Sequence, residues 1–176
     1  MLTLHLRSTF ALAGLALAMA GQAEAGPHED ALAAYRLGNY SVALGIWRPM
    51  AEQGNARAQA NLATLYENGQ GVPRDYAQAL AWSRKAADQG EPLGQANLGE
   101  MYVNGKGVPR DYAQAIAWYR KSAEQGYADS QYDLAVMYDK GEGVPRDVVE
   151  ALKWYGRAAE QGQADAQAAM ARARLR

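Results

Sequence analysis

Three aspartates recur at a fixed interval along the chain: Asp75, Asp111 and Asp147. A row of carboxylates could serve as general acid and base in glycoside hydrolysis, or could hold a metal ion. If each aspartate lies on a separate helix pair, neighbours are roughly 10 Å apart, whereas retaining glycosidases hold their two carboxyl groups roughly 5 Å apart. Inverting hydrolysis tolerates a wider gap, so spacing alone leaves that chemistry open. Because Gln or Glu follows each aspartate three residues later, capping of a helix N-terminus explains all three at once.

Histidine and cysteine, which supply most nucleophilic triads and zinc sites, are nearly missing from this chain. It has no cysteine, and its two histidines, His5 and His28, both lie near the beginning. The remainder of the chain therefore lacks the groups for the common triads and for Cys/His zinc sites. We expect no catalytic residue, no metal site and no cofactor.

A Gly-x-Gly pair also recurs, with Gly69, Gly105 and Gly141 as its first member, and invites comparison with phosphate-binding loops. Phosphate-binding loops of that type follow a strand and carry a third glycine. Here each pair follows a helical pattern and leads into a proline, which has no N–H to donate. The stretch 139–142 likewise lacks the alternating ligands of a calcium loop. We interpret the glycines as turn residues.

These features recur together because the chain repeats itself every 36 residues. The blocks span 55–90, 91–126 and 127–162 and align without a gap. A period of this length is typical of a stacked array in which each unit buries its apolar face against its neighbours. Each block predicts two helices: apolar residues recur with helical spacing from Tyr76 onward, and a glycine such as Gly90 ends the second helix.

The residue pattern of the blocks resembles that of Sel1-like repeats, a short-period relative of the tetratricopeptide repeat. The second block contains the motifs Leu98-Gly99-Glu100-Met101-Tyr102, Gly105-Lys106-Gly107-Val108 and Trp118-Tyr119. The resemblance covers residues 55–162 and implies an all-α fold, a right-handed α-solenoid of helix hairpins. It also implies protein binding rather than catalysis. Several exported proteins of this type pair cysteines between the helices of a repeat, and this chain departs from that pattern.

The first 25 residues predict a secretory signal peptide. Arg7 supplies a positive charge, Phe10–Ala20 forms a short apolar run, and Ala23-Glu24-Ala25 provides a small-x-small cleavage site. The apolar run is too short to span a membrane comfortably. We expect export to the periplasm, with extracellular release as the alternative, and no membrane anchor after cleavage.

Residues 26–176 are then expected to form one solenoid domain. Residues 27–54 resemble an ordinary tetratricopeptide hairpin with a shorter turn, and residues 163–176 restart the first helix as a polar capping helix. The net charge of −1 and the lack of Lys/Arg runs argue against nucleic acid or an anionic membrane as partner.

Partner recognition is expected where the copies differ. If the array curves as tetratricopeptide arrays do, the first helix of each hairpin lines the concave side, and its positions outside the core can hold a peptide. An ordinary solvated face is the alternative for each residue. The candidates are Arg57, Asn61, Thr64, Glu67 and Asn68, then Leu93, Asn97, Glu100, Val103 and Asn104, then Asp129, Asp133, Val136, Asp139 and Lys140.

We therefore expect a non-enzymatic scaffold or adaptor of the bacterial cell envelope that binds an unknown protein or peptide on its concave face. Certain exported Sel1-like proteins have been associated with penicillin binding. A carbohydrate-active or cell-wall enzyme of penicillin-binding type is therefore one alternative. A secreted factor that binds a host protein is the other.

Overall fold

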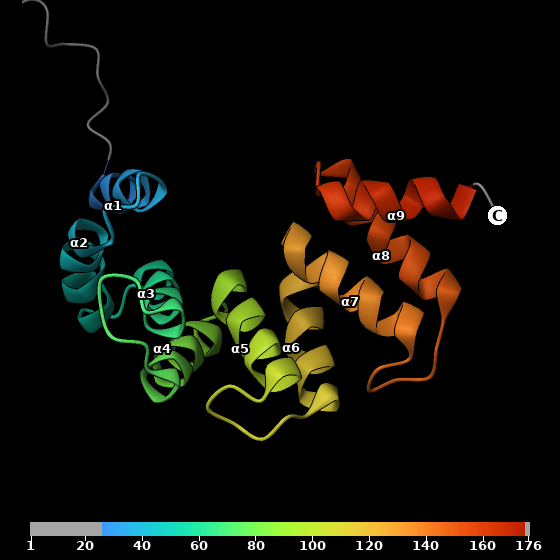
Figure 1. The fold of residues 1–176 in the computed structure, drawn as a ribbon, viewed down its shortest axis with the longest axis horizontal. Helices are drawn as coiled ribbons and strands as arrows, with labels where there is room; N and C mark the ends of the chain where they lie inside the picture. Colours follow the sequence, from blue (N-terminus) through green and yellow to red (C-terminus); the bar gives the residue numbers. More distant parts are fainter. Residues whose placement is uncertain (1–25, 175–176) are drawn as a thin grey trace, which may run out of the picture.

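A computed structural model of the chain describes residues 26–174, and the predicted signal peptide, residues 1–25, lies outside them. In the described range the chain forms α-helices and no strands, arranged as hairpins that follow one another around an arc (Figure 1). The predicted all-α solenoid is confirmed. No helix in the described range is long and apolar enough to cross a membrane. The helices are α1 (Pro27–Arg36), α2 (Tyr40–Glu52), α3 (Ala56–Asn68), α4 (Tyr76–Asp88), α5 (Pro92–Asn104), α6 (Tyr112–Glu124), α7 (Ala128–Lys140), α8 (Val148–Glu160) and α9 (Ala164–Arg174).

The three recurring aspartates cap the second helix of each repeat, as predicted. Asp75 accepts hydrogen bonds from the backbone N–H groups of Ala77 and Gln78, at 2.9 and 3.0 Å. Asp111 and Asp147 each accept one such bond, from the backbone N–H groups of Gln114 and Glu150, at 3.0 and 2.9 Å. The carboxylates therefore satisfy backbone donors that the helix itself leaves unpaired.

The second glycine of each Gly-x-Gly turn brings the loop against the preceding hairpin. A Cβ on Gly71 would lie 2.9 Å from the backbone of Tyr40, and one on Gly107 would lie 2.8 Å from the carbonyl oxygen of Tyr76. Gly143 repeats the contact on Tyr112, where a Cβ would meet the tyrosine Cβ at 2.6 Å. All three glycines have φ between +71° and +75°. No other residue fits both the space and the backbone conformation.

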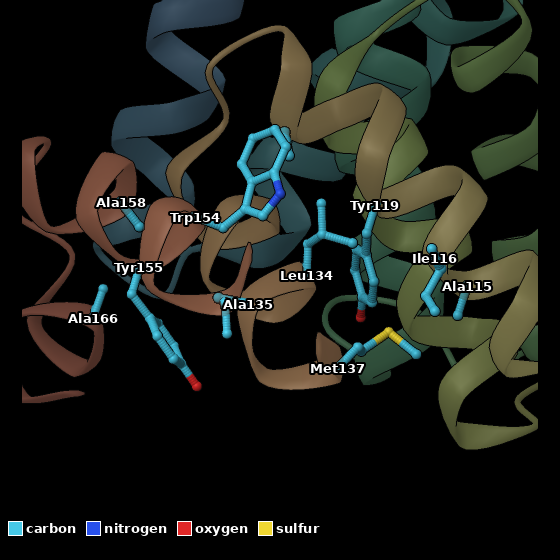
Figure 2. Packing of buried hydrophobic residues seen from close by; sticks show 12 residues of the cluster. Ala115, Ile116, Tyr119, Leu134, Ala135, Met137, Trp154, Tyr155, Ala158 and Ala166 are labelled. Carbon is cyan, nitrogen blue, oxygen red and sulfur yellow. The ribbon is translucent and has the colours of Figure 1, made fainter. Parts of the chain in front are cut away.

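The core consists of apolar side chains shared by neighbouring hairpins. Trp47, Leu62 and Leu65 are fully buried in the N-terminal part. In the C-terminal part, Figure 2 shows Met137 extending towards Ile116 and Ala115, close to the Tyr119 ring. Because side chains from adjacent hairpins fill the same space, each hairpin depends on its neighbours for burial.

Glutamines join the hairpins on the polar side of this core. Gln89 donates to Gln59 at 2.7 Å, and the pairs Gln125–Gln95 and Gln161–Gln131 repeat the bond at 2.8 Å. Gln59 and Gln131 in turn donate to the last turn of the preceding second helix, at the carbonyl oxygens of Ala51 and Ala123. This glutamine ladder ties the end of each hairpin to its beginning and satisfies buried amides.

Candidate protein-interaction face

The predicted binding positions lie on α3, α5 and α7, the first helices of the three repeats, and we call their common surface the first-helix face. α3 contacts α5 directly, as expected on the inner side of an arc. The structure leaves six positions exposed, seven half-buried and two buried. The exposed residues are Arg57, Asn68, Glu100, Asn104, Asp129 and Lys140; the half-buried ones are Asn61, Thr64, Leu93, Val103, Asp133, Val136 and Asp139; the buried ones are Glu67 and Asn97.

Asn97 was expected on the exposed face, and the structure corrects this: the residue is buried and its amide joins two helices. It is 8% exposed, and its Nδ2 donates to the carbonyl oxygen of Ala60 at 3.1 Å and to Thr64 Oγ1 at 3.4 Å. Asn61, one repeat earlier, donates to the carbonyl oxygen of Arg57 on its own helix at 2.9 Å. The side-chain amides of Asn61 and Asn97 are thus already hydrogen-bonded within the protein.

Glu67 is the second correction, because it is 7% exposed and is paired with a loop residue that was not among the predicted positions. Lys106, the middle residue of the second Gly-x-Gly turn, reaches back across the face. Its Nζ lies 2.8 Å from Glu67 Oε1 and 2.9 Å from Glu100 Oε1. Burial raises the pKa of Glu67, although Lys106 opposes the rise. Burial would lower the pKa of Lys106, but its bonds with the two carboxylates outweigh this and raise it.

Asp133 occupies in the third repeat the place of Asn61 and Asn97. The structure shows no hydrogen bond or ion pair from its carboxylate to any described residue. Burial, followed by the charges of Asp129 and Glu100, raises the pKa of Asp133 to about 7. Burial raises the pKa of Tyr119, and the charges of Asp133, Glu100 and Glu67 raise it further. Lys106 joins Glu67 on α3 to Glu100 on α5, and the charge of Glu100 also acts on Asp133 of α7. We call Glu67, Glu100 and Asp133 the acidic centre.

Other predicted positions lie outside this acidic centre. Asp139 is at the end of α7, where its side chain and backbone oxygens accept bonds from Arg146 at 3.4 and 2.7 Å. Lys106 could have been found from the sequence, because the middle residue of the turn differs between copies (Gln70, Lys106 and Glu142) just as the first-helix positions do. Gln70 also contacts the preceding first helix, accepting from the Tyr35 hydroxyl at 3.2 Å.

The recurring tryptophans give no open platform for a ligand. Lys85 Nζ lies 4.0 Å from the centre of the Trp82 ring, and Lys121 Nζ lies 3.9 Å from that of Trp118. Trp154 is buried beneath Arg157, at 4.5 Å. Cations from the same helices stack on all three rings, which favours packing over sugar binding.

The environment of Asp133 predicts that stability falls as the pH rises. The folded protein holds the Asp133 proton more tightly than the unfolded chain, whose ordinary aspartate pKa is 3.8. The stability that the folded protein gains from the proton on Asp133 is therefore complete below pH 3.8 and is lost as the pH approaches about 7. Asp133→Asn should remove this dependence and raise the free energy of unfolding at pH 7.5 by about 1–3 kcal/mol.

Urea unfolding at several pH values measures the effect, with Asp88→Asn as the control. Asp88 is exposed at the end of α4, and its charge is not among those that shift the pKa of Asp133. Its substitution should change stability by less than about 0.5 kcal/mol and should leave the pH dependence unchanged. Equal pH dependence in the wild type and the Asp133→Asn variant would show that Asp133 does not titrate in this range.

Solved structures with the same architecture come from several bacteria. A Sel1 repeat protein from Oxalobacter formigenes is 37% identical, with a TM-score of 0.73 over 81% of this chain. The protein c5321 of uropathogenic Escherichia coli, described as a protective antigen with an SLR fold, is 43% identical, with a TM-score of 0.66 over 75% of this chain. This chain spans 58% and 31% of those two chains. Cysteine rich protein B of Helicobacter pylori shares the fold. It is 23% identical, with a TM-score of 0.55, and the match covers 80% of this chain and 95% of that chain.

The family is established by the repeats themselves. A search of curated proteins finds no match. The Sel1 repeat family model, by contrast, matches residues 56–91, 92–127 and 128–163, which together exceed half of the sequence. Each matched segment is the helix hairpin described above, with its capping aspartate and its Gly-x-Gly turn. The chain belongs to the Sel1 repeat family.

Proposed function

We propose that this chain is a non-enzymatic scaffold of the bacterial cell envelope, which binds a lysine- or arginine-bearing segment of a partner protein on the first-helix face. Sel1 repeat proteins typically mediate protein–protein interaction, which supports the general role. The acidic centre on α3, α5 and α7 is the observation that carries the choice of partner. Basic side chains suit it because each carboxylate raises the energy of its ionised neighbours.

The arrangement of charges supports a cationic rather than an anionic partner. Lys106 already bridges Glu67 and Glu100, so one positive charge offsets two carboxylates. Asp129 and Asp133 on α7 add two more carboxyl groups, and the charges of Asp129 and Glu100 both act on Asp133. A guanidinium or ammonium group placed between Asp129 and Asp133 would form charge-assisted hydrogen bonds in a partly buried site, where they are stronger than in open water.

Hydrolysis by the three recurring aspartates is not part of this proposal. Asp75, Asp111 and Asp147 are engaged by backbone N–H groups at their helix ends. Among the described residues, no cluster of three His, Cys, Asp or Glu side chains is placed to hold a metal ion. A carbohydrate-active or penicillin-binding reaction therefore has no assigned acid, base or nucleophile in this proposal.

Export to the envelope is a separate proposal, supported by the signal-peptide pattern of residues 1–25. The mass of the envelope form should correspond to a chain that begins at Gly26, or at Gly21 if cleavage follows Ala18-Met19-Ala20, a second small-x-small site. Full-length chain recovered only from the cytoplasm would contradict export.

A secreted factor that binds a host protein is the second candidate, favoured by the 43% identity to a protective antigen. Recovery of the processed chain from culture medium would support it.

Affinity capture from envelope extract tests partner binding when wild type and a charge-neutralised variant are compared. Asp129→Asn with Asp133→Asn removes two negative charges while keeping side-chain size. Loss of one charge-assisted bond of about 1.5–3 kcal/mol weakens binding about tenfold or more. Binding of the captured partner should therefore weaken at least that much and should fall with added salt.

The matched control is Asp88→Asn with Glu124→Gln, which removes two exposed charges from corresponding places on α4 and α6. It should bind as the wild type does. If both double variants bind the partner with wild-type affinity, the first-helix face is not the binding surface. If the affinity is unchanged by salt, the partner is not recognised through charge.

A further inference from the structure

Lys106 is a loop residue that closes one half of the first-helix face. Its Nζ lies 2.8 Å from Glu67 Oε1 and 2.9 Å from Glu100 Oε1, so a single ammonium group joins α3 to α5. The Glu67 side chain is 7% exposed and the Glu100 side chain is 49% exposed. One buried and one accessible carboxylate therefore already hold an ammonium group, and this group comes from the chain itself.

The turn on either side of Lys106 fixes the place from which its side chain reaches the face. Gly105 and Gly107 have φ of +67° and +71°, and a Cβ on Gly107 would lie 2.8 Å from the Tyr76 carbonyl oxygen. The backbone N–H of Lys106 donates to the Met101 carbonyl oxygen at 3.0 Å. Because this backbone is already ordered, pairing costs less conformational entropy for Lys106 than for a basic residue of a free peptide.

The α7 half of the first-helix face is not closed in this way. In the part of the chain that the structure describes, no lysine or arginine forms an ion pair with Asp129 or Asp133. Lys106 is also not among the groups whose charge shifts the pKa of Asp133. Lys106 therefore offsets the charge of the α3 and α5 half and leaves the α7 half open to a partner.

The residue at the middle of the turn differs in each repeat. Gln70 stands at this position in the first repeat and Glu142 in the third. Gln70 also contacts the preceding first helix, where it accepts from the Tyr35 hydroxyl at 3.2 Å. The position thus reaches the preceding first helix in two repeats, and it carries a positive charge in the second repeat alone.

We propose that Lys106 sets the specificity of the first-helix face, because its ammonium group occupies the place that a second basic side chain of a partner would take. This role of Lys106 rests on the proposed function, in which one partner cation pairs with Asp129 and Asp133. A second positive charge one hairpin spacing away, roughly 10 Å, would meet Lys106 instead of a free carboxylate. The preferred partner segment is therefore one that is recognised through a single basic residue.

Two synthetic peptides with blocked termini are the probes: Ser-Gly-Arg-Gly-Gly-Ser-Gly-Ser, with one arginine, and Ser-Gly-Arg-Gly-Gly-Arg-Gly-Ser, with two. The two arginines of the second peptide can lie up to about 10 Å apart in an extended chain. NMR titration at pH 8, where the Asp133 carboxyl group is largely ionised, and at low ionic strength measures binding with little screening. Both peptides should shift signals of α7 in the wild type, with affinities that differ by no more than about twofold, the statistical advantage of two equivalent arginines.

Lys106→Gln gives the decisive comparison, because it places the residue of the first repeat in the second turn and frees both carboxylates. This variant should bind the two-arginine peptide about tenfold or more tightly than the one-arginine peptide. The additional shifts should lie on α3 and α5. Lys106→Arg, which keeps the positive charge, should retain the wild-type result.

Two further variants separate this effect from a general change of charge. Lys140→Gln removes an exposed lysine of α7 that forms no ion pair with a described residue, and it should leave the two peptides equally bound. Addition of Glu100→Gln to Lys106→Gln should abolish the preference for two arginines, because one of the two freed carboxylates is then missing.

A wild type that already binds the two-arginine peptide about tenfold more tightly than the other would overturn the role of Lys106, whether or not the variants fold. Equal affinities of a folded Lys106→Gln variant for the two peptides would overturn it as well. In both cases the proposed function would stand if Asp129→Asn with Asp133→Asn abolished binding of the one-arginine peptide. If neither peptide gives saturable shifts on α7 of the wild type, the proposed face and the role of Lys106 are both wrong.

Discussion

The contact between the second glycine of each Gly-x-Gly turn and the start of the preceding second helix sets the geometry of the whole array. At Gly107 a Cβ would approach the Tyr76 carbonyl oxygen to 2.8 Å, so backbone lies directly on backbone. This contact fixes how far each hairpin is displaced from the one before it. It also sets the position of the middle residue of the turn. Lys106 therefore lies between two carboxylates of different repeats.

The fold was predictable because its determinants are local and repeated. Capping by Asp75 depends on residues two and three positions away, and the left-handed glycine at Gly69 ends α3 within its own turn. Such short-range signals can be read from one copy and checked against two others. The packing of hairpins into a solenoid then follows, because each amphipathic pair leaves an apolar face that only a neighbour can cover.

The candidate site was less predictable because its contacts span a whole repeat. Lys106 and Glu67 are 39 positions apart, and the pairs of the glutamine ladder are 30 apart. Whether such residues meet depends on the rotation between hairpins, which helical periodicity does not specify. Asn97 was wrongly assigned to the exposed face for the same reason, since its partner at Ala60 belongs to the previous repeat. Asp133 occupies the position of Asn97 in the next repeat but carries a carboxyl group in place of the amide. A position that joins two helices in one repeat therefore holds an ionisable group in the next.

Hydrogen exchange of a Gly107→Ala variant tests most directly whether the loop contact couples the hairpins. Alanine there must adopt a left-handed backbone at φ +71° and displace the Tyr76 backbone. The account predicts faster exchange on both sides of the contact, in α4 as well as in α5 and α6, while α8 and α9 keep their protection. Gly156→Ala, in α8 with open space around it, should leave exchange in α4–α6 unchanged. Faster exchange confined to the loop itself would contradict the account, because the hairpins would then be held together without this contact.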